Sequence, residues 1–454
     1  MFENKKILIL GMARSGYEAC KYLSKYNNTI ILNDGGSRDK QDENKIKELE
    51  QLGVTLIFDS HPDDLLDDSF DYIIKNPGIR NDHKYVIKAK ELGIEVINEA
   101  EMTYRLLPDD VTLIGITGTN GKTTTTTLTY EMIKKSGKRV HLAGNIGYPL
   151  CSFLDKLESG DIIVMEVSCQ QLANMKEFRP HIALMTNLSE AHIDFFGSYD
   201  EYKKVKLKLF ANQTEDDVSI LNIENDEVMK GTTDIKSNVK YFSSKREVNG
   251  GYLLDNKLYY YDELIISRDE FLLKGNHNVE NALGAMMMAK EVGVDNESIV
   301  GVLKTFTGVR HRLEFIDKVK GVDYYNDTEA TNTKCTTIAL SSFDKNVFLI
   351  LGGLERGQDF HDLDNFIGPV KEIVGIGECR DRVKEYGDSI GIKTTIYEKL
   401  VDAMGYINNA VEDGDTVLLS PASASWDQYK QCEDRGDEFR DIVRSFKDDK
   451  KELE

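Results

Sequence analysis

The feature that most constrains this chain is an apolar strand that runs into a glycine-rich loop and then into a helix-forming segment, Thr112-Leu-Ile-Gly-Ile-Thr-Gly-Thr-Asn-Gly-Lys-Thr-Thr124. Gly118 and Gly121 allow the backbone to turn its N–H groups inward at a helix N-terminus, an arrangement that binds phosphate groups. Lys122 is then placed to reach the outer phosphates, and the Thr123 hydroxyl to bind magnesium. The segment therefore predicts a phosphate-binding loop; the alternative is a chance glycine turn before a Thr-rich helix.

The amino-acid composition limits which partners the protein can bind and in which compartment it is expected. The 454 residues include 57 Lys and Arg against 78 Asp and Glu, a formal net charge of −21. This acidity argues against a nucleic-acid partner, because phosphate backbones bind basic surfaces. Six cysteines without a CxxC pair argue against a zinc site or a disulfide framework. No apolar stretch approaches the roughly 20 residues of a membrane span, so we expect a soluble cytoplasmic protein without membrane insertion, and a monomer.

Residues 5–34 read as strand, glycine turn, helix and strand, which is how a Rossmann-type unit begins. The turn that starts at Gly11 has Ala13 where a glycine would favour pyrophosphate, so the nucleotide signal is weak. Asp34 ends the second strand, where an acidic residue often binds a sugar hydroxyl, but a strand-end Asp is as often only a turn residue. We leave open whether this unit binds a nucleotide or nucleotide sugar. Further strands are expected at 54–58, 72–76 and 94–98.

A second unit continues from the glycine loop with strands expected at 138–142, 161–167, 182–187 and 218–222. Polar residues follow these strands at the edge where open α/β sheets bind ligands: Asn145, Glu166, Asn187 and His192. Glu166 is placed to hold the magnesium that Thr123 binds, unless it is a solvated strand end. His192 is either a metal ligand or an ordinary loop histidine.

Lys206 lies on a helix expected from about residue 200 to 212 and shares a face with Tyr202, Leu209 and Phe210. That face predicts an interior position. Burial lowers the pKa of a lysine and favours the neutral amine, which reacts with CO2 to give an anionic carbamate. The alternative is a lysine whose ammonium reaches solvent from a basic helix.

The remaining sequence predicts a hairpin and a third unit. Residues 251–267 look like a β-rich insertion that turns at Asp255-Asn256. Asn278 and Asn281, one helical turn apart, either cap the helix that follows or face a nucleotide. A further Rossmann-like sheet is expected from strands at 347–352, 372–376, 394–397 and 416–420. The fold class is therefore α/β with three domains, at 1–98, 99–309 and 310–454.

Several motifs in a fixed order resemble those of the Mur ligase family, and the likeness covers essentially the whole chain. They are Gly118-Thr-Asn-Gly-Lys-Thr, Glu166-Val-Ser168, His192-Ile-Asp194, Lys206, His277-Asn278, His311-Arg312, Asn326-Asp327, Ala330-Thr-Asn332 and Ser420-Pro-Ala-x-Ala-Ser-Trp-Asp427. The nearest branch adds D-glutamate to UDP-N-acetylmuramoyl-L-alanine in the synthesis of peptidoglycan precursors. This resemblance implies that ATP phosphorylates the carboxylate of the UDP substrate and that the amine of the amino acid attacks the resulting acyl phosphate.

The resemblance also implies a role for each matching residue. It implies two magnesium ions, one held by Thr123 and Glu166 and one by His192 and a carbamylated Lys206, with Lys122, His192 and Lys206 catalytic. ATP would be bound by Gly118, Thr119, Asn120, Gly121, Lys122, Thr123, Thr124, Asn278, Asn281, Arg312 and Asp327, the last two completing the site when domains close. The UDP substrate and the acceptor would be bound by Arg14, Ser15, Asp34, Asn76, Gly78, Asn145, Thr331, Arg356, Ser425 and Trp426.

One motif departs from the family. The third-domain segment commonly reads Asn-Asp-Ser-Lys-Ala-Thr-Asn, whereas here Glu329 replaces the lysine, and Cys432 stands where some members have phenylalanine. A dicarboxylate acceptor needs nearby positive charge, so we expect Glu329 to turn away or to pair with Arg356 or Lys334. Competing hypotheses are a ligase with another acceptor, a dehydrogenase, which leaves the Lys122 loop unexplained, and a non-catalytic nucleotide sensor.

Overall fold

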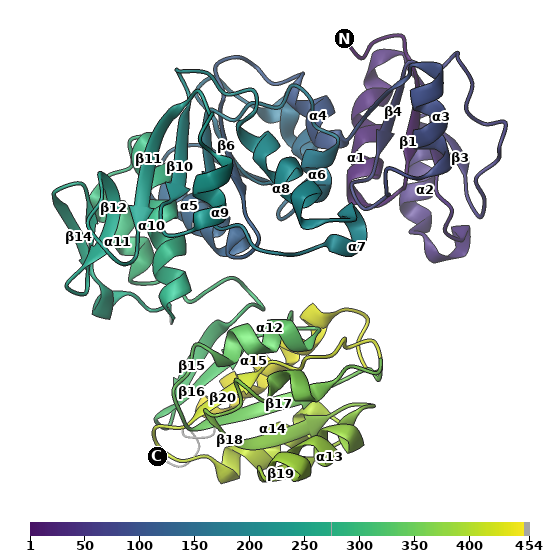
Figure 1. The fold of residues 1–454 in the computed structure, drawn as a ribbon. Helices are drawn as coiled ribbons and strands as arrows, with labels where there is room; N and C mark the ends of the chain where they lie inside the picture. The colour runs from purple at the N-terminus through teal and green to yellow at the C-terminus, as the bar shows by residue number, and fades with distance from the viewer. Residues whose placement is uncertain (274, 449–454) are drawn as a thin grey trace. The chain divides into compact units, whose positions relative to one another are not determined.

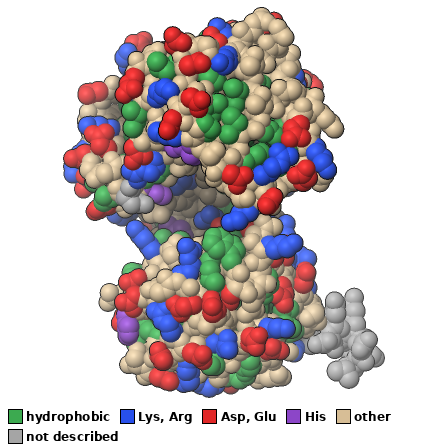
Figure 2. Space-filling model, turned by 90° about the vertical axis from the view of Figure 1, so that its right-hand side faces the viewer, with side chains coloured by type: hydrophobic (Ala, Val, Ile, Leu, Met, Phe, Trp, Pro, Cys, Tyr) green, Lys and Arg blue, Asp and Glu red, His purple; other side chains and the backbone are tan. Residues whose placement is uncertain are grey.

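The computed structural model describes residues 1–273 and 275–448, which form two compact units (Figure 1). The first unit comprises Met1–Asp269 and Val279–Leu303, and the second Glu270–Asn278 and Lys304–Glu454. Among the described helices, none combines the length and apolar character that a membrane crossing requires. Acidic and basic side chains are interspersed over the face drawn in Figure 2.

The N-terminal sheet of the first unit has five parallel strands in the order β3-β2-β1-β4-β5. Ile7 and Ile9 of β1 pack with α1 and α2 on one face, and Leu8 and Leu10 pack with α3 on the other, because successive side chains of a strand point to opposite faces. The elements are β1 (Lys6–Leu10), α1 (Arg14–Leu23), β2 (Thr29–Asn33), α2 (Glu43–Gln51), β3 (Thr55–Ile57), β4 (Tyr72–Lys75), α3 (Lys84–Leu92), β5 (Glu95–Ile97) and α4 (Glu99–Tyr104).

The larger sheet of the first unit has nine strands in the order β14-β13-β12-β11-β10-β9-β6-β8-β7. Within this sheet the pairs β12–β13 and β13–β14 are antiparallel. Asp255 and Asn256, both with positive φ, form the turn between β12 and β13. The strands are β6 (Thr112–Thr117), β7 (Val140–Gly144), β8 (Ile162–Glu166), β9 (Ile182–Met185), β10 (Val218–Asn222), β11 (Asn238–Ser243), β12 (Gly250–Leu254), β13 (Lys257–Tyr260) and β14 (Glu263–Ser267). The helices are α5 (Lys122–Lys135), α6 (Cys169–Ala173), α7 (Ile193–Phe196), α8 (Tyr199–Leu207), α9 (Asp226–Gly231), α10 (Asn276–Glu291) and α11 (Asn296–Leu303).

The second unit contains a six-stranded sheet in the order β15-β16-β20-β17-β18-β19, parallel except for β15 with β16. Phe348 and Ile350 face α14 and α15, whereas Leu349 and Leu351 face α12 and α13. The elements are β15 (Glu314–Val319), β16 (Val322–Asn326), α12 (Thr333–Leu340), β17 (Val347–Gly352), β18 (Val370–Ile376), α13 (Arg380–Ile390), β19 (Thr394–Ile396), α14 (Leu400–Ala410), β20 (Thr416–Leu419) and α15 (Cys432–Asp448).

The predicted α/β class with three sheets is confirmed, as is the hairpin at Asp255-Asn256. Every predicted strand is present, with ends shifted by a few residues, such as β7 at Val140–Gly144. Three strands were not predicted: β11, β15 and β16. The sequences of β11 and β15 each mix a lysine with apolar residues. Strand formation there depends on pairing, of β11 with β10 and β12 and of β15 with the adjacent β16. The predicted domain limits at 98/99 and 309/310 stay predictions.

Candidate functional site

The loop between β6 and α5 has no room for side chains at its two predicted glycines. Gly118 has φ +148° and Gly121 has φ +79°. A Cβ at Gly118 would collide with Thr186 Oγ1, and one at Gly121 with Asn281 Oδ1. The end of β9 holds the same loop, because the Thr186 hydroxyl donates to the carbonyl of Asn120 at 2.6 Å. Only glycine allows this close backbone approach.

Lys122, the first residue of α5, folds back over its own loop. Its Nζ donates to the carbonyl oxygens of Gly118 at 3.0 Å and Thr119 at 2.9 Å. Thr123 and Thr124 follow in the first helical turn and are half-buried. Asn281, on α10, accepts a hydrogen bond from Thr125 of α5 at 3.3 Å, so it faces the loop helix rather than capping α10. Asn278 is buried.

Lys206 is buried behind the same loop, with 1% of its surface exposed. Its Nζ donates to the Gly118 carbonyl at 2.7 Å and to Thr117 Oγ1 at 3.1 Å, and lies 5.4 Å from the centre of the Tyr202 ring. Burial lowers the pKa of this lysine to about 7, with a further contribution from the nearby charge of Lys122. The predicted interior position is confirmed, and the solvent-reaching alternative is wrong.

Glu166, the last residue of β8, is also buried, which excludes a solvated strand end. Its Oε1 accepts a hydrogen bond from Asn145 Nδ2 at 2.7 Å. Its Oε2 is buried and accepts no hydrogen bond from the described residues. A buried carboxylate oxygen without a donor costs free energy unless a cation binds it. Glu166 therefore fits a metal ligand in the electrostatic neighbourhood of Lys206.

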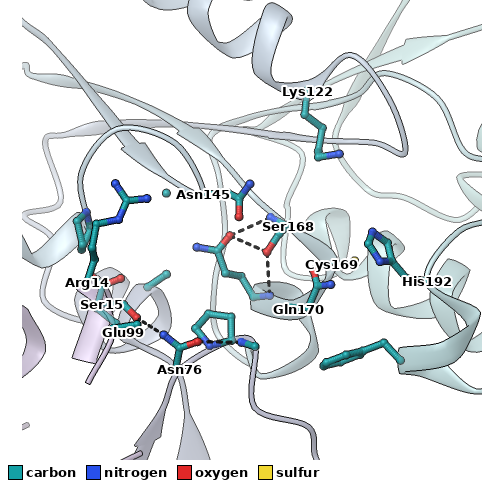
Figure 3. Close-up of a pocket in the computed structure, with 18 of the residues that line it drawn as sticks. Arg14, Ser15, Asn76, Glu99, Lys122, Asn145, Ser168, Cys169, Gln170 and His192 are labelled. Carbon is teal, nitrogen blue, oxygen red and sulfur yellow. Dashed lines mark hydrogen bonds between the residues drawn. The ribbon is translucent and has the colours of Figure 1, made fainter. Parts of the chain in front are cut away.

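A cavity of about 540 Å3 lies in front of these residues within the first unit (Figure 3). Lys122 enters it from α5 and His192 from the residue before α7. His192 is exposed, has φ +52° and lies 6.1 Å, ring to ring, from Tyr202. The predicted site residues that line the cavity are Arg14, Ser15, Asn76, Gly78, Lys122, Asn145, His192 and Lys206.

The N-terminal sheet contributes one wall of this cavity. Asn76 Nδ2 donates to Ser15 Oγ at 3.1 Å, and Arg14 Nη1 donates to the Gly147 carbonyl at 3.3 Å. Asp34 does not line the cavity: its carboxylate accepts from the backbone N–H groups of Met12 at 2.7 Å and Gly36 at 2.8 Å. These bonds match the turn-forming alternative for Asp34, so its sugar contact stays a prediction.

The second unit holds the other predicted site residues at the carboxyl edge of its sheet. Asp327 is buried, accepts from Ser420 Oγ at 2.7 Å and from the Leu313 N–H at 3.0 Å, and has a pKa that burial raises to about 7. Arg356 lies over the Trp426 ring at 5.6 Å. Ser425 is buried and its Oγ has no hydrogen-bond partner among the described residues, and Thr331 is half-buried.

The expected partner of Glu329 is wrong. Glu329 pairs with Arg312, Nη2 to Oε2 at 3.3 Å, and not with Arg356 or Lys334. The reason is the antiparallel pairing of β15 with β16. The Glu329 N–H donates to the His311 carbonyl at 3.1 Å, which holds the segment before β15 against the segment after β16. Arg312 is therefore the nearest cation, although 17 residues separate it from Glu329.

Sequence reasoning missed two groups of residues. Ser168, Cys169, Gln170 and Gln171 line the cavity, and Ser168 with Gln171 forms a capping box at α6, a Ser-x-x-Gln pattern that was visible in the sequence. Arg435 is fully buried on α15. Its spacing to Phe439 and Val443 puts it on the apolar face of that helix, the same signal that identified Lys206.

Comparisons with known proteins agree with this geometry. Residues 5–98 match the family model described as the Mur ligase MurD-like N-terminal domain, and residues 116–289 match the Mur ligase middle domain. The chain is 42% identical over 447 residues to the UDP-N-acetylmuramoylalanine–D-glutamate ligase of Lactococcus lactis subsp. cremoris strain MG1363, covering 98% of this chain and 99% of the relative. It is 40% identical over 449 residues to the ligase of the same name from Geobacillus sp. strain WCH70, with coverage of 98% and 99%.

Solved structures show the same fold. UDP-N-acetylmuramate–alanine ligase MurC from Thermotoga maritima aligns with a TM-score of 0.59 at 18% identity, covering 97% of this chain and 99% of that one. MurF ligase from Thermotoga maritima, solved in complex with ADP, aligns with a TM-score of 0.58 at 18% identity, covering 93% and 97%.

The lowered pKa of Lys206 predicts a pH-dependent stability. The pKa of Lys206 falls from 10.5 to about 7 on folding. Between these two pH values the unfolded state therefore binds one more proton than the folded state. The free-energy cost of burying the protonated amine is fully present below pH 7 and is lost as the pH rises toward 10.5. Relative to Lys206→Met, the parent protein should gain about 3 kcal/mol in its free energy of unfolding between about pH 6 and pH 9.5. Urea unfolding in CO2-free buffer measures this gain. The same comparison with Lys204→Met, a change at an exposed neighbour on α8 that leaves Lys206 in place, should show no pH-dependent difference from the parent. Parallel profiles for the parent and Lys206→Met would contradict the assignment.

Proposed function

The chain belongs to the Mur ligase family, and from this membership we propose that it is an ATP-dependent ligase that joins D-glutamate to UDP-N-acetylmuramoyl-L-alanine in the synthesis of peptidoglycan precursors. Relatives about 40% identical over nearly the whole chain carry that activity in their names. The observation that carries the proposal is that the buried Lys206 donates to the glycine loop, and that Lys122, from the same loop, lines the same cavity as His192. This arrangement suits phosphoryl transfer to a carboxylate.

The first step activates the carboxylate of the UDP substrate. A carboxylate oxygen attacks the γ-phosphorus of ATP, the bond to the β,γ-bridging oxygen breaks, and an acyl phosphate and ADP result. The loop from Gly118 to Thr124 binds the phosphates through its backbone N–H groups, as the steric exclusion of side chains at Gly118 and Gly121 supports. Lys122 leaves its loop carbonyls and neutralises charge on the transferred group. Asn281 borders this loop, and Asn278, Arg312 and Asp327 are proposed as further ATP contacts.

Two magnesium ions would neutralise the phosphoryl and carboxylate oxygens in this step. Thr123 and Glu166 would hold one ion, and the buried, undonated Oε2 of Glu166 fits that role. His192 and Lys206 would hold the other. A neutral Lys206 amine attacks CO2 and loses a proton to give an N-carboxylate, which turns a buried cation into an anionic ligand. The pKa of about 7 makes the neutral amine available at neutral pH.

The remaining residues bind the two substrates. Arg14, Ser15, Asn76, Gly78 and Asn145 line the cavity in the first unit and would bind the UDP substrate, with Asp34 supporting the turn beside them. Thr331, Arg356, Ser425 and Trp426, in the second unit, would bind D-glutamate. Its amine nitrogen attacks the acyl carbon, loses a proton, and phosphate leaves to complete the amide bond.

The purified protein should release phosphate only when ATP, magnesium, UDP-N-acetylmuramoyl-L-alanine and D-glutamate are all present. Mass spectrometry should find the glutamyl product, and Lys122→Met should lose at least about 99% of the rate, because no other residue of the loop supplies a positive charge to the outer phosphates. A protein that binds ATP without turnover would favour the nucleotide-sensor alternative. Preferred use of a neutral or cationic amino acid would favour another acceptor.

The carbamate assignment predicts chemical rescue. Lys206→Ala should abolish ligation and regain part of the activity in acetate or propionate, because a small carboxylate fits the space left by the carbamate. Initial rates at constant ionic strength measure the rescue. Equal recovery in chloride would contradict the assignment, and Lys122→Ala, which removes a cation from the same cavity, should recover nothing in either salt.

The Glu329–Arg312 pair predicts weakened use of D-glutamate. Glu329→Lys should lower the KM for D-glutamate by about fivefold or more, because it replaces a like charge with an opposite one near a dicarboxylate, and Glu329→Gln should lower it less. The KM for ATP is measured separately, because both changes also remove the partner of Arg312, a proposed ATP contact. Asp388→Asn, which removes an exposed acidic charge elsewhere in the second unit, is the control. Unchanged D-glutamate kinetics in both Glu329 variants would show that Glu329 lies outside the acceptor pocket.

A further inference from the structure

Arg435 is a buried arginine that hydrogen-bonds the ends of three strands of the second unit. Only 1% of its surface is exposed. Its Nε donates to Thr328 Oγ1 at 3.0 Å, and its Nη2 donates to the carbonyl oxygens of Thr328 at 3.2 Å and Ser423 at 3.0 Å. Its Nη1 donates to the carbonyl of Gly352 at 3.4 Å. A planar guanidinium, with donors pointing in several fixed directions, is the side chain that can hold three segments at once.

The three segments are those that carry the proposed acceptor residues. Thr328 follows β16 and lies three residues before Thr331. Gly352 ends β17 and lies four residues before Arg356. Ser423 follows β20 and lies two residues before Ser425. One side chain of α15 therefore connects every segment from which an acceptor contact is proposed.

Further contacts show that this junction is tightly built. The Leu354 N–H donates to the Ala424 carbonyl at 2.8 Å, which joins the segments after β17 and β20. Thr328 Oγ1 donates to the Cys432 carbonyl at 2.9 Å, which joins the segment after β16 to the start of α15. Gly353 has φ +149°, and a Cβ there would lie 2.9 Å from Arg435 Nη1 and collide with the Ala424 carbonyl. Position 353 therefore has no space for a side chain larger than that of glycine.

The charge of Arg435 is not paired directly with a carboxylate among the described residues. Its hydrogen-bond partners are carbonyl and hydroxyl oxygens, and the carboxylate of Asp427 acts on it only through its charge. Burial lowers its pKa to about 10, so it stays charged at neutral pH. A buried cation with no carboxylate in direct contact exerts a positive potential on neighbouring groups, because the protein interior screens it weakly. Glu329, which replaces a family lysine, lies on the same edge, one residue after Thr328.

We propose that Arg435 is the positioning residue of the acceptor edge: it holds the segments after β16, β17 and β20 in register and supplies positive potential for a dicarboxylate acceptor in a chain whose family lysine is Glu329. The inference rests on the proposed function, since it assumes that Thr331, Arg356 and Ser425 bind that acceptor. Arg435 acts through these segments and is not itself a contact of the acceptor.

Arg435→Lys tests the proposal because it keeps the charge and loses the planar fork. The KM for D-glutamate should rise about tenfold or more, since at least one charge-assisted hydrogen bond is lost. Hydroxylamine trapping of the acyl phosphate, which needs ATP and UDP-N-acetylmuramoyl-L-alanine but no acceptor, should stay within about twofold. Thr328→Val, which removes the Nε acceptor, should also raise the KM, and Thr328→Ser should restore it. An equal fall of ligation and trapping in Arg435→Lys would overturn the proposal.

Hydrogen exchange of the protein without substrates separates this proposal from the proposed function. Arg435→Lys should speed amide exchange in 327–332, 353–357 and 421–426 together. Arg440→Lys is the matched control, because Arg440 is buried on the same helix but pairs with Glu314 at 2.7 and 2.8 Å, and it should leave those segments and the KM for D-glutamate unchanged. Unchanged amide exchange rates in Arg435→Lys would overturn the proposal, regardless of which substrate the enzyme uses. If the parent did not catalyse ligation but amide exchange was faster in Arg435→Lys, only the proposed activity would be contradicted.

Discussion

The amine of Lys206, buried against the carbonyl of Gly118, is the interaction on which the rest of the first unit depends. It donates to this carbonyl from α8 while Lys122 donates to the same carbonyl from α5, and both side chains line the cavity. Two cations on one loop carbonyl repel each other, which contributes to the low pKa of Lys206. Phosphate binding, or conversion of Lys206 to a carbamate, would relieve this repulsion between Lys206 and Lys122.

The second unit uses a buried cation in a similar way. Arg435 bonds the carbonyls of Thr328, Gly352 and Ser423, just as Lys206 bonds the carbonyl of Gly118. Parallel sheets end their strands at one edge, and the loops that follow carry the polar residues. Such loops need a donor from outside the sheet to satisfy their carbonyl groups. A helical lysine provides it in one unit and a helical arginine in the other.

Local patterns identified most of the candidate site. The glycine spacing around Lys122 and the carboxylate at the end of β8 are visible without a fold, because loop and strand chemistry is encoded over a few residues. The burial of Lys206 followed from its helical face. Arg435 carries the same signal with Phe439 and Val443, so its burial is also encoded in the sequence of its helix. The pairing of Glu329 with Arg312 was not predicted, since the two residues meet only because β15 and β16, neither of which was predicted, pair as a hairpin.

The sequence by itself determined the alternation of strands and helices that builds the three sheets, the glycine loop, and the residue types at the strand ends, because periodicity and turn chemistry are local properties. The tertiary structure alone decided which of those residues meet. It brought Asn145 onto Glu166 and left the other carboxylate oxygen without a donor. It engaged Asp34 with backbone N–H groups, and it paired Glu329 with Arg312. Contacts between residues far apart in the chain depend on strand order and packing, which no short window of sequence contains.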